Sequence, residues 1–171
     1  MSTLEEVAKG KRYRELLELY KSIKRGEVEI TDPSPPQDFY AYLTRPDYSG
    51  WLWTGILLTS LTILTIPLSN YSSIVLYLRY ILGSIFVLFL PGYYTLEALY
   101  PREEDLSSLE RLALSMGLSL ALVPLFGLVL NYTPWGIRLW PVVESLSIYT
   151  VIIAFIAAYR KYLIVRKRLA G

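Results

Sequence analysis

The chain has 171 residues, of which 53% are hydrophobic and 19% are charged, and its formal net charge at pH 7 is +2. Because it contains no cysteine and no histidine, disulfides and thiolate metal sites are excluded, and any catalysis would have to use carboxylates, hydroxyls, lysine or arginine. The charged residues avoid most of the second half of the chain, where apolar residues form long blocks. This distribution is typical of an integral membrane protein rather than of a soluble domain.

Residues 1–26 are predicted to form a cytoplasmic amphipathic helix. Apolar residues recur there at three- and four-residue steps and therefore share one face, and Gly26 is well placed to end the helix. This helix could cover its own domain or lie at the lipid headgroups, and alternatively it could dock a partner protein. Its mixed charges argue against a dedicated lipid anchor. The segment has no apolar signal-peptide region, so we expect the first membrane helix to direct insertion.

Residues 27–50 are predicted to be a proline-rich linker that leads into an interfacial segment. Pro33, Pro35 and Pro36 exclude regular structure in the linker. The aromatic residues that follow have one apolar end and one hydrogen-bonding end, which favours the boundary between bilayer and water. We therefore expect the chain to approach the bilayer through this segment.

The rest of the chain, residues 51–171, is predicted to be an all-α, polytopic membrane domain. It contains four apolar stretches, each long enough to cross the hydrocarbon core of a bilayer as a helix. The four helices are expected at about residues 51–68, 74–99, 109–130 and 139–159, and a basic tail follows the last one.

The positions of lysine and arginine predict the orientation of these helices. Fifteen of the 17 basic residues lie in residues 1–50, in the turn at residues 101–111 or in the tail after Tyr159, and the other two are Arg79 and Arg138. Because basic residues favour the cytoplasmic side, we expect both termini and the 101–111 turn to be cytoplasmic in a multi-pass protein of the plasma membrane.

Arg79 and Glu144 are ionisable residues inside apolar stretches, where a charge is costly and is often functional. Each lies a few residues from the outer end of its helix, so their depths are similar and an interhelical ion pair is geometrically reasonable. Alternatively, each side chain could reach the outer headgroups independently. A third possibility is a ligand or lipid-phosphate site that uses Arg79, which Arg138 could join.

Two sets of residues predict how the second and third membrane helices are shaped and packed. Pro91 and Gly92 predict a kink, because proline removes a backbone donor and clashes with the preceding turn. In the third helix Ser115, Gly117 and Ser119 are small, and small residues let membrane helices approach closely. We expect both features to serve packing.

The remaining polar motifs give no prediction of a cofactor, a metal or a catalytic residue. The acidic turn at residues 103–105 could in principle hold Mg²⁺ with a phosphate substrate, but its composition is ordinary for a turn that caps a helix. Asn70 and Asn131 match the N-glycosylation acceptor pattern. Each lies against the membrane in a short loop, and we expect both to be unmodified.

Three sequence blocks in this order resemble the uncharacterised family DUF1616, which comprises mainly archaeal multi-pass membrane proteins. The blocks are FVLFLPGYYTLEALYP, ERLALSMGLSLALVP and NYTPWGI. The LPGY element also occurs in polyprenyl-phosphate-dependent glycosyltransferases. The resemblance implies an archaeal plasma-membrane protein with no established activity, and it carries over no catalytic residues.

Three functional hypotheses follow. The first is a non-enzymatic structural or accessory subunit of the cell envelope, with membrane lipids and a membrane-protein partner or a second copy as its contacts and with no nucleic acid. The second is a lipid- or polyprenyl-phosphate-binding protein connected with envelope glycosylation, in which Arg79 and Arg138 bind the phosphate. The third is a transporter or channel subunit, although four helices leave little room for a pore.

Overall fold

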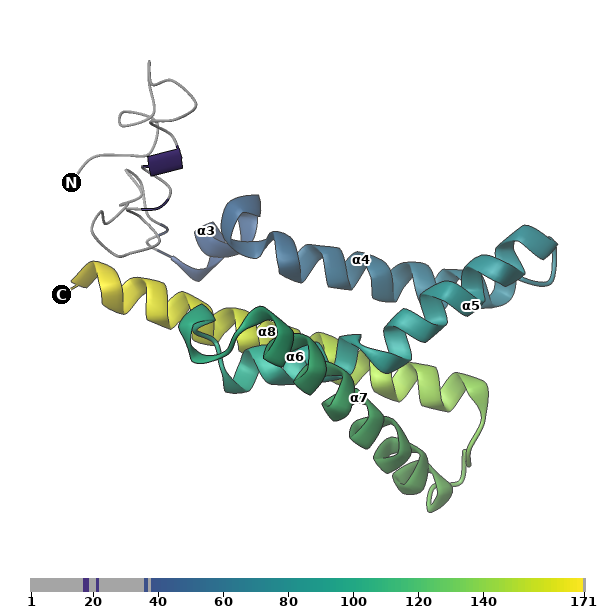
Figure 1. Ribbon diagram of the computed structural model, residues 1–171. Coiled ribbons are helices and arrows are strands. Elements are labelled where there is room, and N and C mark those ends of the chain that lie inside the picture. The colour runs from purple at the N-terminus through teal and green to yellow at the C-terminus, as the bar shows by residue number, and fades with distance from the viewer. Residues whose placement is uncertain (1–16, 19–20, 22–35, 37, 171) are drawn as a thin grey trace. The chain divides into compact units, whose positions relative to one another are not determined.

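The computed structural model describes residues 17–18, 21, 36 and 38–170 (Figure 1). The chain divides into two units, residues 1–36 and residues 37–171. The amphipathic helix predicted over residues 1–26 lies outside the described residues except for residues 17, 18 and 21, and of the proline-rich stretch before residue 38 the structure describes Pro36. The description below therefore concerns the second unit, which we call the membrane domain.

The membrane domain is helical, with no strand in residues 38–170. Four of its segments are long and apolar enough to cross a membrane, as the sequence predicts, with α5 and α6 together forming one of them. In chain order the helices are α3 (Phe39–Thr44), α4 (Pro46–Leu68), α5 (Ser73–Leu88), α6 (Leu90–Leu99), the short 3₁₀ turn η1 (Glu103–Asp105), α7 (Ser108–Asn131) and α8 (Leu139–Ala170).

Two helices extend beyond the ranges expected from the sequence. Helix α4 begins at Pro46 rather than near residue 51, because proline is well accommodated in the first turn of a helix, where its missing N–H has no partner to lose. Helix α8 continues to Ala170 rather than ending at residue 159. Its basic tail is rich in Lys, Arg, Leu and Ala, which are strong helix formers, so the tail extends the last helix.

Helix α6 lies at the centre of the packing, against both α7 and α8 (Figure 1). Helix α4 packs against α5 and α8, and α3 closes against α4 and α8. The buried core alternates bulky aromatic and leucine side chains with alanines of α8, which allow close approach of the helices. Its members are Tyr42, Leu52, Phe86, Leu90, Tyr94, Leu146, Ala154, Ala158 and Tyr162.

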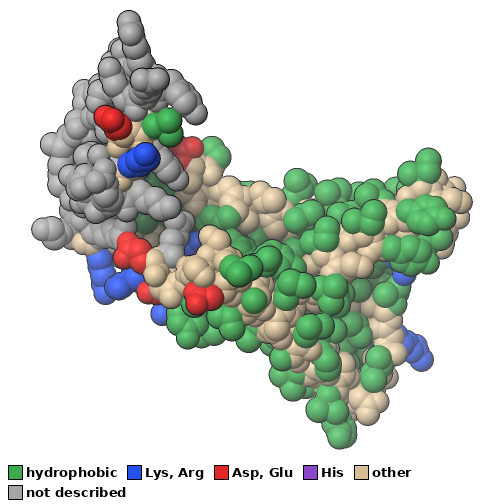
Figure 2. All heavy atoms as spheres, in the orientation of Figure 1, with side chains coloured by type: hydrophobic (Ala, Val, Ile, Leu, Met, Phe, Trp, Pro, Cys, Tyr) green, Lys and Arg blue, Asp and Glu red, His purple; other side chains and the backbone are tan. Residues whose placement is uncertain are grey.

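The two ends of the membrane domain differ in chemistry. We call the end at which α6 finishes and α7 begins the charged end, and the end with the turns at residues 69–72 and 132–138 the loop end. Between them the helices expose many large apolar side chains, and hydrophobic atoms dominate the face drawn in Figure 2. Such a surface is unfavourable in water but suits contact with lipid.

Candidate functional site

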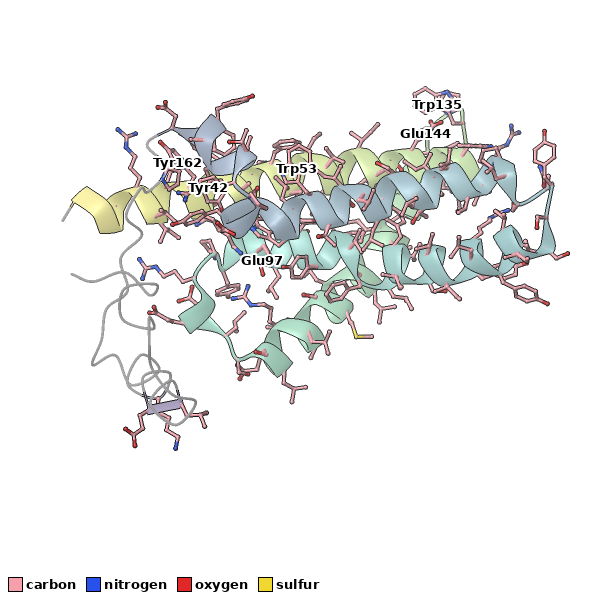
Figure 3. All side chains as sticks on the ribbon, turned by 90° about the horizontal axis from the view of Figure 1, so that it is seen from above. Tyr42, Trp53, Glu97, Trp135, Glu144 and Tyr162 are labelled. Carbon is pink, nitrogen blue, oxygen red and sulfur yellow. The ribbon has the colours of Figure 1, made fainter. Side chains whose placement is uncertain are left out.

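At the charged end the membrane domain buries one carboxylate, that of Glu97. Glu97 lies in the last turns of α6 and is only 2% exposed, because α6 is covered by both α7 and α8 (Figure 3). A buried charge is costly unless it is paired and hydrogen-bonded. The position therefore demands cationic partners from the neighbouring helices.

Two cations from different helices meet this carboxylate. The guanidinium of Arg111, on α7, donates to Oε1 of Glu97 at 2.6 Å. The ammonium of Lys161, on α8, lies 2.6 Å from Oε2 as an ion-pair contact. One side chain of α6 thus links three helices.

Two arginines, Arg111 and Arg160, donate to backbone carbonyls in the last turn of α6 and in the turn that follows it. The second terminal nitrogen of Arg111 donates to the carbonyl of Arg102 at 2.9 Å, and Arg160 donates to the carbonyl of Ala98. The last carbonyls of a helix have no partner within the helix and carry partial negative charge. Arginines placed there satisfy these carbonyls and hold the turn to α7 in position.

Lys161 extends the cluster to α4. Its ammonium lies 4.3 Å from the ring centroid of Trp51, within the range of a cation–π interaction. The four spanning segments are therefore all tied together at the charged end. We call Trp51, Glu97, Arg111, Arg160 and Lys161 the Glu97 cluster.

Two hollows of about 360 Å³ each flank the Glu97 cluster and share Pro101, Arg102 and Ile164 in their lining. One hollow adds Arg160 and Lys167 opposite Asp105, and the other lies beside Trp51 and Lys161. Tyr42, which borders the second hollow from α3, has its pKa raised from the ordinary tyrosine value because burial disfavours the charged phenolate. Tyr42 is therefore a neutral hydroxyl at physiological pH.

The residues expected to kink the second helix lie at its break. Helix α5 ends at Leu88 and α6 starts at Leu90, with Phe89 between them outside helical geometry. Pro91 follows in the first turn of α6, where it cannot donate to the α5 backbone. The backbone therefore breaks two residues before the proline.

Gly92 lies at the closest contact between α6 and α7. Its backbone N–H, which has no partner within the first turn of α6, donates to Oγ of Ser119 at 2.8 Å. A Cβ atom at Gly92 would overlap the carbonyl oxygen of Ser115. Ser115 and Ser119 are fully buried against this glycine, whereas Gly117 is exposed on the opposite face of α7.

A second close contact joins α6 to α4. The hydroxyl of Tyr94 lies 3.1 Å from the carbonyl of Trp51 and 3.2 Å from that of Leu52, to either of which it can donate. A Cβ atom at Gly55, which lies one turn further along α4, would overlap the Tyr94 hydroxyl. The glycine therefore provides the room that this hydrogen bond needs.

The ionisable residues expected near the loop end are not brought together. Arg79 donates to Oγ of Ser69 at 3.0 Å and forms no ion pair with Glu144 in the described structure. Glu144 is exposed and lies beside Trp135, on the side of the domain opposite to α5 (Figure 3). Arg138 is exposed in the turn before α8. Arg79 lines a hollow.

The residues that follow the acidic turn cap the start of α7. Ser107 caps α7 by accepting from the backbone N–H of Glu110, and the Glu110 carboxylate accepts from the backbone N–H of Ser107. This reciprocal pair is a capping box. In the part of the chain that the structure describes, no three acidic side chains come close enough to hold a metal ion.

Comparison with known families matches residues 57–169 to the family described as "Domain of unknown function (DUF8471)". The chain belongs to this family. The resemblance to DUF1616 was wrong, because DUF8471 is a different family and no DUF1616 match is found. The archaeal source that DUF1616 implied has no support either. No curated protein and no solved structure matches this DUF8471 member.

The sequence did not reveal the Glu97 cluster. Most of its members lie in segments whose composition is typical of the membrane interface or of a basic tail, where such residues are ordinary. These members are Trp51, Arg160 and Lys161. One signal was available: Glu97 is the one carboxylate within the second apolar stretch, and Arg111 begins the next stretch across a short turn. A helical hairpin places these two positions at the same depth.

Proposed function

We propose that this DUF8471 protein is a non-enzymatic, multi-pass plasma-membrane protein that serves as a structural or accessory subunit. In this proposal its charged groups hold its own helices together, and an uncovered face of α7 binds a membrane-spanning helix of another subunit. The Glu97 cluster supports the first part, since its carboxylate is already engaged by Arg111 and Lys161.

The observation that carries the proposal is the outer face of α7. Ala113, Gly117 and Ala121 are four residues apart on this helix, and all three are exposed. A Cβ atom at Gly117 would meet nothing within 4 Å. Small residues at four-residue spacing form the face through which membrane helices most often approach one another. Large exposed neighbours such as Met116 and Leu120 would pack around an incoming helix.

The proposal includes an orientation. The charged end carries Arg102, Arg111 and the basic residues of the α8 tail, whereas Arg79 and Arg138 belong to the loop end. By the preference of basic residues for the cytoplasmic side, the charged end and both termini are cytoplasmic. Because the chain has no cysteine, single cysteines at Ser72 and at Ser108 test this in intact cells. A membrane-impermeant maleimide should label Ser72→Cys alone.

A substitution within the α7 face tests the subunit role. The full chain is purified from its native membrane in mild detergent, and its partners and their stoichiometry are measured by mass spectrometry and light scattering. Gly117→Leu should release the bound subunit, or a second copy of this chain. The matched control is Gly127→Leu, because Gly127 is on the same helix with equally open surroundings but lies about 15 Å further along the helix axis and about 80° around it from Gly117. Equal retention by wild type and both variants contradicts the proposed docking face.

A further inference from the structure

Arg79 is a cation for which the described structure supplies no acidic partner. It lies in the second turn of α5 and is half-buried. In the described part of the chain its side chain donates a hydrogen bond to Oγ of Ser69, which in turn donates to the carbonyl of Ile66 at 2.7 Å. Ser69 follows the last residue of α4, so the guanidinium extends toward the loop end. Arginine has five N–H donors in a planar fork and no acceptor, and among the described residues one of these donors has a hydrogen-bond acceptor.

This guanidinium stands at the edge of an apolar hollow of about 440 Å³, within the size range of small-molecule sites. The hollow lies between α4, α5 and α8, and its walls include Ile66, Val87 and Val143. Two hydroxyls in the lining are already bonded to their own helices, Thr62 to the carbonyl of Leu58 and Ser84 to that of Tyr80. Besides these hydroxyls the lining has the phenol of Tyr80, the guanidinium of Arg79 and an otherwise hydrocarbon surface.

The hollow is elongated along α5. Arg79 and Leu88 both line it and are nine residues apart, which corresponds to about 13 Å of helix rise. The cation is at the loop end of this path, and the apolar lining continues toward the middle of the spanning segment. A ligand that fits has a compact anion at one end and a long apolar chain behind it.

We propose that this hollow binds one phospholipid of the surrounding bilayer, with its phosphate on Arg79 and one hydrocarbon chain between α4, α5 and α8. A phosphate accepts two parallel hydrogen bonds from a guanidinium, and the pairing is stronger where water is scarce. It also removes the cost of holding an unpaired cation at this depth. Ser69 acts as a positioning residue. Its oxygen accepts from the guanidinium, and its one hydroxyl proton is donated to the carbonyl of Ile66, so Ser69 does not itself donate to the phosphate. The site is independent of the α7 face that carries the proposed function.

The absence of native cysteine allows a direct test on the full chain in detergent. A fluorophore on Val87→Cys, inside the hollow, is titrated with phosphatidylglycerol that carries a nitroxide quencher midway along one chain. The same fluorophore on Ile85→Cys, which is exposed on α5 and does not line the hollow, reports ordinary contact with micellar lipid. We expect half-maximal quenching at a lipid concentration at least about tenfold lower for Val87→Cys. Equal concentrations for the two positions overturn the site.

Three substitutions in the Val87→Cys background separate the two halves of the site. Arg79→Leu should raise the half-quenching concentration at least about tenfold, and Gly83→Phe, which fills the hollow and leaves Arg79 in place, should do the same. Arg138→Leu removes a charge from the same end without touching the hollow and should change it less than about twofold. If Arg79→Leu and Arg138→Leu behave alike, only general charge attraction is present and the site is overturned.

Two further measurements test whether Arg79→Leu loses binding through misfolding and whether the site binds an anion without a hydrocarbon chain. Arg79→Lys keeps the charge and is expected to retain the fold, and it should weaken binding by an intermediate factor because an ammonium cannot make the two parallel bonds. Unchanged binding in Arg79→Lys contradicts the pairing with phosphate. Inorganic phosphate at millimolar concentration should displace little of the quencher-labelled lipid. Full displacement would mean an anion site without a place for the chain.

Discussion

The two ends of the membrane domain treat charge in opposite ways. At the charged end, Glu97 is buried between Arg111 and Lys161, and the helices converge on it. At the loop end, Arg79 has a serine hydroxyl as its protein partner, and the start of α5 diverges from the end of α7 (Figure 1). A buried or half-buried ionisable residue therefore fixes the helix bundle where its counter-charge lies within the chain. Where the chain supplies no counter-charge, the residue remains available to a ligand.

The largest effect should come from removing the centre of the Glu97 cluster. Glu97→Ala leaves two cations facing each other with no carboxylate, and losing one partner of a buried pair costs about 3–5 kcal/mol. The free energy of unfolding in detergent, measured by titration with a denaturing detergent and circular dichroism, should fall by this amount. A change below about 1 kcal/mol would mean that the cluster is solvated and does not hold the helices. Combining Glu97→Ala with Arg111→Met should cost less than the sum of the two single changes, because the two residues interact.

The next effect concerns the contact between α6 and α7. Gly92→Ala places a methyl group against the carbonyl of Ser115, and overpacking of this kind costs about 1–3 kcal/mol. The matched control is Gly117→Ala, whose new methyl group meets nothing and should stabilise the helix by up to about 1 kcal/mol. The two variants therefore shift the unfolding midpoint in opposite directions. A stabilised Gly92→Ala protein would contradict the close α6–α7 contact.

A smaller effect is expected for the hydrogen bond between α6 and α4. Tyr94→Phe removes a hydroxyl that has Trp51 and Leu52 carbonyls in reach, and a neutral hydrogen bond contributes about 1 kcal/mol. The same detergent titration should show this loss. Tyr149→Phe, at the hydroxyl 2.8 Å from that of Thr95, is a comparison at the α6–α8 contact and should cost a similar amount. A fall of less than about 0.3 kcal/mol in both would mean that these bonds are exchanged for others without loss.

Much of this arrangement could be predicted from the sequence, because hydropathy and length depend on local composition. The four spanning helices follow from four apolar blocks, and the break near Pro91 follows from the chemistry of proline. The side-chain partners could not be predicted in the same way. The depth of a residue is read from its place along a helix, but its partner also depends on how the helix is rotated about its axis. Arg79 and Glu144 have similar depths, yet Glu144 points away from α5 (Figure 3).

The same limit explains the family assignment. The three blocks that resembled DUF1616 are largely leucine, aromatic and small residues, a composition that membrane helices and their ends share whatever their function. The DUF8471 match extends continuously over residues 57–169, so it covers the helices together with all the turns between them. The ion pairs of Glu97 with Arg111 and Lys161 become visible as a set only when three helices are assembled.

The smallest effect on stability is expected for substitutions of Arg79 and Glu144, near the loop end. Arg79→Leu removes one hydrogen bond to Ser69, which destabilises the fold, and also removes a half-buried charge, which stabilises it. Because the two contributions oppose each other, the free energy of unfolding in lipid-free detergent should change by less than about 1 kcal/mol. Glu144→Gln should be neutral, and the double variant should equal the sum of the single ones within about 0.5 kcal/mol, because residues that share no contact behave additively. A coupling above about 1 kcal/mol would instead reveal an ion pair between the two.

When phosphatidylglycerol is added, wild type and Glu144→Gln should become more stable, whereas Arg79→Leu should not, since a ligand stabilises only the form that binds it. That contrast would show that the counter-charge of Arg79 comes from the bilayer, while the counter-charges of Glu97 come from the chain itself.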